Sequence, residues 1–87
     1  MKIEFDSKKA ATNLKKHGVS FDEAATCLLD TMALVQEDHD AEGEFRWTLV
    51  GMSNQARLLV VVYTVRGELI RLISARKPTT KEVNYYA

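Results

Sequence analysis

The sequence predicts an α+β domain with two N-terminal helices, an antiparallel β-sheet and a short C-terminal helix. Helical spacing of apolar residues, bounded by capping residues, occurs in the N-terminal third and again briefly near the C-terminus. The remainder consists mainly of short runs rich in Val, Leu and aromatic residues, which favour strands. The chain has 87 residues, of which 46% are hydrophobic and 28% charged, as in one globular domain. We therefore expect a single domain over residues 1–87.

The first elements are a short edge strand at residues 3–5 and a helix over residues 7–17. Asp6 or Ser7 can cap the helix N-terminus, because a short side-chain oxygen accepts the unpaired N–H groups of the first turn. Gly18 can end it, because glycine readily adopts the left-handed conformation that closes many helices.

A second helix is predicted directly after Gly18. Ser20 and Glu23 have the spacing of a capping box, in which each side chain bonds to the backbone of the other residue. The apolar stripe that follows consists of Phe21, Ala24, Ala25 and Leu28. Cys27 lies beside this stripe, and we expect it to be a buried core residue.

The rest of the chain is predicted to form strands and a final helix. The predicted strands are residues 32–35, 44–51, 57–65 and 68–77, with a polar loop at residues 36–43. On the second of these, alternation places Trp47 in the core with Phe45 and Leu49. A capping box formed by Thr79 and Glu82 opens the C-terminal helix.

The last two strands are predicted to form a hairpin around Arg66 and Gly67. A two-residue turn there would place Arg57 opposite Arg76. Two cations at such a position repel each other unless an anion lies between them.

The charge is segregated along the chain although its total is zero. Residues 1–19 carry +3, residues 20–45 carry −8 and residues 46–87 carry +5. This pattern predicts separate basic and acidic surfaces, unless folding brings the segments together again.

Several classes of protein and site are disfavoured. A lone Cys27 excludes an internal disulfide, and no run approaches the ~20 apolar residues of a membrane span. The N-terminus lacks the character of a signal peptide, so we expect a cytoplasmic protein without membrane contact. Ser74 and Cys27 lack the sequence context of a nucleophile. Residues 37–40 could hold a divalent cation only loosely, so we expect neither a metal site nor a cofactor.

The basic residues indicate a different chemistry. They are Lys15, Lys16, His17, Arg46, Arg57, Arg71, Arg76 and Lys77. RNA cleavage needs no cofactor, because the 2′-hydroxyl of the substrate supplies the nucleophile. Arginines on strands can stabilise the phosphate, and histidine can move a proton near neutral pH. His17 has a second interpretation as a residue that only caps its helix, and Arg46 has one as an ion-pair member.

The residues also resemble a known family. Residues 13–24, N-L-K-K-H-G-V-S-F-D-E-A, resemble the N-K-H-G-V-S-F-E-E-A signature of BrnT-type toxins. Residues 71–76, R-L-I-S-A-R, resemble the family's R-I-I-S-A-R strand. Further similar positions are Glu44, Arg46 and Trp47, the hydrophobic residues 62–64, and Glu82 with Tyr85 or Tyr86.

The resemblance implies the toxin half of a bacterial type II toxin–antitoxin pair, with a RelE-like ribonuclease fold. It also implies a ribbon-helix-helix antitoxin, through which the complex binds operator DNA. The family positions matched here are Lys16, His17, Glu44, Arg46, Arg71, Ser74 and Arg76.

We therefore predict an endoribonuclease that needs no metal. The expected catalytic residues are His17, Arg46, Arg71 and Arg76. The expected substrate-binding residues are Lys16, Glu44, Arg57, Ser74 and Lys77. The alternative is a non-catalytic binding module, a degenerate toxin that acts as a co-repressor with its DNA-binding partner.

Overall fold

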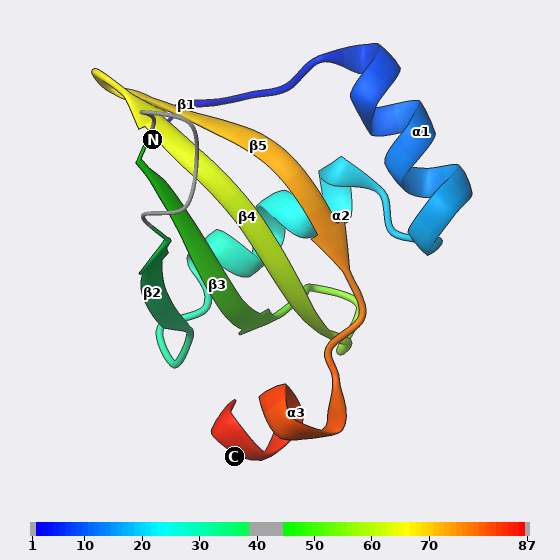
Figure 1. Ribbon diagram of the computed structural model, residues 1–87, viewed down its shortest axis with the longest axis vertical. Coiled ribbons are helices and arrows are strands. Elements are labelled where there is room, and N and C mark those ends of the chain that lie inside the picture. Colours follow the sequence, from blue (N-terminus) through cyan, green and yellow to red (C-terminus); the bar gives the residue numbers. More distant parts are fainter. Residues whose placement is uncertain (1, 39–44, 87) are drawn as a thin grey trace.

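The computed structural model describes residues 2–38 and 45–86 (Figure 1). In chain order, the elements are β1 (Lys2–Glu4), α1 (Ser7–His17), α2 (Phe21–Thr26), the 3-10 turn η1 (Cys27–Leu29), β2 (Leu34–Asp38), β3 (Arg46–Met52), β4 (Leu58–Arg66), β5 (Leu69–Arg76) and α3 (Thr80–Tyr86). This order confirms the α+β class. None of the helices described is long and apolar enough to cross a membrane.

The five strands form one mixed sheet in the order β1-β5-β4-β3-β2. The expectation of a purely antiparallel sheet is wrong at one edge, because β1 pairs with β5 in parallel. A parallel pair needs a long crossover connection, and here everything from α1 to β4 lies between the two strands. The other neighbouring strands are antiparallel.

The first helix has the predicted bounds because both of its caps form. The carboxylate of Asp6 accepts hydrogen bonds from the backbone N–H groups of Lys8 at 2.8 Å and Lys9 at 3.2 Å. Gly18 has a φ of +70° and donates its N–H to the carbonyl of Leu14. A side chain at Gly18 would be strained in this left-handed conformation.

The two predicted capping boxes have different outcomes. Between Thr79 and Glu82 both reciprocal bonds form, at 3.2 Å and 2.8 Å. At the start of α2 only half of the box forms, because Ser20 accepts from the N–H of Glu23 while the Glu23 carboxylate turns to a distant partner.

The predicted register of the β4–β5 hairpin is wrong. The turn residues are Gly67 and Glu68, so that Arg66 pairs with Leu69. Gly67 has a φ of +59°, which suits a central position of a two-residue hairpin turn. The register shifts again between Val62 and Tyr63, and Arg76 lies opposite Val60 instead of Arg57.

This second shift is a β-bulge at Ile73, the extra residue between the pairs Val62–Ser74 and Tyr63–Leu72. Side chains alternate between the faces of a strand, and one extra residue reverses that alternation. The bulge therefore places Arg71 on the same face as Ser74.

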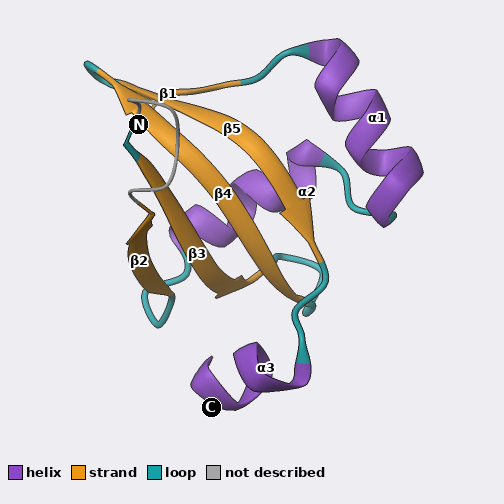
Figure 2. Ribbon diagram, viewed as in Figure 1, coloured by secondary structure: helices purple, strands orange, loops and turns teal. Residues whose placement is uncertain are grey.

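Helix α2 and η1 cover one face of the sheet (Figure 2). The core they form with the sheet consists of Val19, Phe21, Ala24, Cys27, Leu49, Leu59, Val61, Leu72 and Ala75. The predicted burial of Cys27 is confirmed. Trp47 is half-buried and stacks on Tyr63, whereas Phe45, expected beside it in the core, is 60% exposed.

Helix α1 lies beside the part of the β5 edge that does not pair with β1 (Figure 1). Helix α3 contacts β3 at the other end of the molecule. Strand β2 extends to Asp38, into the region expected to be a loop. Glu44 lies outside the residues that the structure describes.

Candidate functional site

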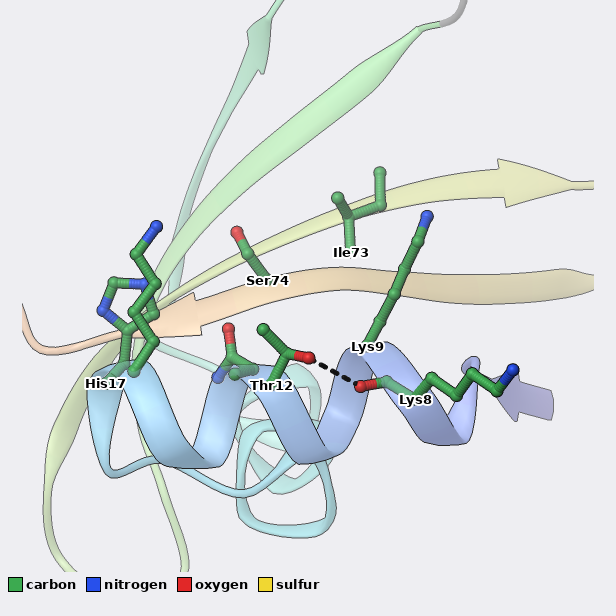
Figure 3. Close-up of a pocket in the computed structure, with 8 residues that line it drawn as sticks. Lys8, Lys9, Thr12, His17, Ile73 and Ser74 are labelled. Carbon is green, nitrogen blue, oxygen red and sulfur yellow. Dashed lines mark hydrogen bonds between the residues drawn. The ribbon is translucent and has the colours of Figure 1, made fainter.

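A groove of about 320 Å³ runs between α1 and β5. Its lining residues are Lys8, Lys9, Thr12, Asn13, Lys16, His17, Ile73 and Ser74. Figure 3 shows His17 at one end of the groove and Lys8 and Lys9 at the other, with Ser74 and then Ile73 between them. Three of the predicted site residues, Lys16, His17 and Ser74, are therefore brought together from two elements.

Asn13 holds the two walls of this groove in place. Its Nδ2 donates to the carbonyl of Ala75 at 2.8 Å, and its Oδ1 accepts from the N–H of Ala75 at 3.1 Å. The same Nδ2 donates to the carbonyl of Val19 at 3.0 Å. Strand β1 pairs with the edge of β5 only as far as the Glu4–Arg71 pair. Beyond that pair, the Asn13 amide forms the hydrogen bonds to β5 that a neighbouring strand would form.

The helical wall follows from residue spacing. Lys8, Thr12 and Lys16 are four residues apart, and so are Lys9, Asn13 and His17. Residues at this spacing lie on one face of a helix. Lys8 and Lys9 are not among the site residues that the sequence predicts, although their four-residue spacing from Thr12 and Asn13 is a signal that identifies them.

The groove is cationic. Four of its eight lining residues are lysine or histidine, and none of the eight is acidic. Within residues 2–38 and 45–86, no carboxylate forms an ion pair with Lys8, Lys9, Lys16 or His17. The nearby Asp6 carboxylate is occupied by backbone N–H groups, and these bonds lower its pKa. The groove is therefore suited to an anion, with the Ser74 hydroxyl on the opposite wall.

Three of the predicted arginines, Arg46, Arg71 and Arg76, lie on the sheet face that also carries Ser74. Arg71 forms an ion pair with Glu4 at 3.2 Å. Arg46 is the first residue of β3, which lies two strands from β5, or about 10 Å across the sheet. Its Nε is buried and has no hydrogen-bond partner among the described atoms. Such a donor is expected to bind a ligand or water.

Arg57 lies elsewhere, in an ion pair with the buried Glu23 carboxylate that joins α2 to the residue before β4. Its Nε donates to Glu23 at 3.0 Å, and Ser53 Oγ donates to the same carboxylate at 2.6 Å. The Glu23 side chain is 3% exposed. Its pKa is lowered chiefly by the hydrogen bond from Arg57, against the effect of burial. This contact explains why the Glu23 carboxylate does not complete the capping box.

Arg76 is also held by a carboxylate. Its two terminal nitrogens donate to the two oxygens of Glu82 at 2.8 Å and 2.9 Å, which ties the end of β5 to α3. The hydrogen bond from Arg76 lowers the pKa of Glu82 to about 2. Lys77, the residue that follows Arg76 in the sequence, has an exposed side chain.

The acidic run at residues 37–40 ends outside the described part of the chain. Among the residues described, no three His, Cys, Asp or Glu side chains converge on a point where a metal ion could bind.

Comparisons with known proteins agree with the fold. Residues 5–82 match the family described as the ribonuclease toxin BrnT of type II toxin–antitoxin systems. The crystal structure of the Brucella abortus ribonuclease toxin BrnT superposes with a TM-score of 0.70 at 29% sequence identity, covering 92% of this chain and 99% of that one. No match was found among curated proteins. The chain belongs to the BrnT family of ribonuclease toxins of type II toxin–antitoxin systems.

Proposed function

We propose that this protein cleaves RNA in the α1–β5 groove without a metal ion, and that a ribbon-helix-helix antitoxin blocks this groove. The observation that carries the proposal is the convergence of Lys16, His17 and Ser74 on one cationic groove with no acidic lining residue. Family membership supports the reaction class, because its name describes a ribonuclease toxin.

In the proposed reaction the 2′-hydroxyl oxygen attacks the adjacent phosphorus, and the bond from phosphorus to the 5′-oxygen breaks. The 2′-hydroxyl loses a proton and the leaving 5′-oxygen gains one, so the products are a 2′,3′-cyclic phosphate and a 5′-hydroxyl. His17 carries one of these two proton transfers, since an imidazole can act as acid or base near neutral pH. Water carries the other.

The negative charge that develops on the phosphate needs fixed donors. Lys16 and the Ser74 hydroxyl supply them within the groove, on opposite walls. We assign Arg46 and Arg71, on the adjoining sheet face, to the same task. Lys77 and Glu44 keep their sequence-based assignment to substrate binding.

Arg57 and Arg76 receive a different assignment from the one the sequence suggested. Each makes a hydrogen-bonded ion pair with a carboxylate of another element, Glu23 or Glu82. We propose that both pairs are structural.

The deciding experiment is cleavage of a labelled single-stranded RNA in excess EDTA. Wild-type protein should cut it, and His17→Asn should reduce the rate by about 10²–10⁴-fold. Lys15→Ala is the matched control, because Lys15 is exposed on the same helix but does not line the groove. Its rate should equal that of the wild type.

Two results would contradict this proposal. Cleavage that disappears with EDTA and returns with magnesium would overturn the metal-free mechanism. Wild-type protein that leaves RNA intact but still represses an operator together with its antitoxin would favour the non-catalytic co-repressor.

A further inference from the structure

We propose that the Lys8–Lys9 end of the α1–β5 groove is a second phosphate subsite, which binds single-stranded RNA several nucleotides away from the cleaved bond. This inference rests on the proposed function, because it takes the His17 end of the groove as the place where the scissile phosphate lies. It adds a substrate-binding site and a preferred substrate length.

The two ends of the groove are separated by most of α1. Lys8 and Lys9 precede His17 by eight or nine residues, which is about 12–14 Å at 1.5 Å per residue. Nucleotides stacked at about 3.4 Å each would cover this distance in roughly three to four steps. A strand with one phosphate at His17 therefore places another phosphate beside Lys8 and Lys9.

The two lysines are available for such a contact. Both side chains are exposed, and neither forms an ion pair within the described ranges, 2–38 and 45–86. Asp6, the nearest acid along the chain, is already bonded to the backbone N–H groups of the same two residues. A phosphate would be a stronger partner for their ammonium groups than water alone.

The middle of the groove favours a nucleotide over a simple anion. Ile73, the residue at the β-bulge, contributes an apolar side chain to a groove that is otherwise basic or polar (Figure 3). The Thr12 hydroxyl is already used, since it donates to the carbonyl of Lys8 at 3.0 Å. An apolar surface between two cationic ends suits a base or ribose flanked by phosphates. A single strand exposes its bases for this contact, whereas a duplex stacks and pairs them.

The experiment measures binding of oligouridylates with 2′-O-methyl groups, which cannot be cut, in a length series from two to eight nucleotides. For wild-type protein we expect affinity to rise by roughly ten-fold between the dinucleotide and the hexanucleotide. Lys8→Ala/Lys9→Ala should lose this gain while its affinity for the dinucleotide stays unchanged. For the hexanucleotide, the dependence of log affinity on log salt concentration should be shallower by about 0.7 in this variant, the value for one phosphate contact on a single strand.

The matched control is Lys15→Ala/Lys81→Ala, which removes the same charge from exposed positions outside the groove. It should retain the length dependence, and thermal melting should show both double variants folded. Equal losses in the two variants would mean a general charge effect and overturn the subsite. Unchanged RNA binding with a weakened antitoxin complex would also overturn it, by assigning this end of the groove to the antitoxin.

Failure of the subsite and failure of the proposed function give different results, because binding of these oligonucleotides does not require cleavage. A protein that shows the length dependence but cuts no RNA would support the subsite and contradict the catalytic proposal.

Discussion

The side-chain amide of Asn13 pairs with both backbone polar groups of Ala75, so that one residue of α1 replaces a neighbouring strand along β5. Asn13 is 7% exposed and Ala75 is fully buried, so water cannot replace these bonds. His17 lies one helical turn after Asn13, on the same face of α1. The contact therefore holds the histidine next to the strand that carries Ser74.

We predict that Asn13→Leu lowers the free energy of unfolding by about 3 kcal/mol. The substitution leaves the N–H and C=O of Ala75 buried without partners, and each such group typically costs about 1–3 kcal/mol. Chemical denaturation measures the change. The control is Asn84→Leu on α3, where the side chain is exposed and the effect should be below about 0.5 kcal/mol. Similar small changes in both variants would mean that the Asn13 bonds contribute little.

The ion pair between Arg76 and Glu82 predicts that removing Arg76 lowers the stability of the fold and leaves RNA cleavage largely unchanged. Arg76→Ala and Glu82→Gln should each lower the melting temperature, because each breaks the bidentate contact between β5 and α3. We expect a coupling energy of roughly 1–2 kcal/mol in a double-mutant cycle, since the pair is partly exposed. RNA cleavage per folded molecule should stay within about two-fold of wild type.

The opposite result has a clear signature. A loss of about 10²–10³-fold in cleavage by Arg76→Ala, with near-normal cleavage by Glu82→Gln, would return Arg76 to the catalytic residues that the sequence suggested.

The same ion pair predicts a dependence of stability on acid. The pKa of Glu82 falls to about 2 in the folded protein, below its ordinary value of about 4.3. A lowered carboxyl pKa stabilises the folded state above the ordinary value, and the stabilisation is lost as the pH falls towards about 2. The melting-temperature difference between wild type and Glu82→Gln should be largest above pH 5 and shrink steadily as the pH falls to about 2. A difference that is the same at pH 5 and pH 2 would point to another cause.

Cys27 should be unreactive in the folded protein. Burial raises the pKa of its thiol to about 11, with smaller contributions from Glu23 and Asp30. At pH 8 the thiolate fraction would be about two hundred-fold lower than for an ordinary thiol with a pKa near 8.5. As the chain has one cysteine, labelling with a disulfide reagent reports this site alone. Labelling should be slow in buffer and fast in denaturant, and rapid labelling of the folded protein would contradict the burial.

The antitoxin should bind over the basic groove and the adjoining strand β5. Hydrogen exchange of the complex is expected to show protection in α1 and β5, because the net charge of residues 46–87 is +5 and α1 adds the lysines of the groove. Protection confined to residues 30–44, the acidic stretch, would place the antitoxin elsewhere.

The sequence by itself determined the local elements of this protein. Helix α1 begins after Asp6 and ends before Gly18, and both signals act within four residues of the helix ends. The capping box of Thr79 and Glu82 is equally local. The family motif also identified Lys16, His17 and Ser74, and the structure places these three residues in one groove.

Tertiary structure alone decided which side chains meet across the chain. Glu23 has the same capping-box spacing as Glu82, yet its carboxylate bonds to Arg57, 34 residues later, because burial makes a charged partner more valuable than a local N–H. The bulge at Ile73 likewise has no local sequence signal. It sets the face on which Arg71 and Ser74 lie, and pairing between whole strands determines where such an extra residue is accommodated.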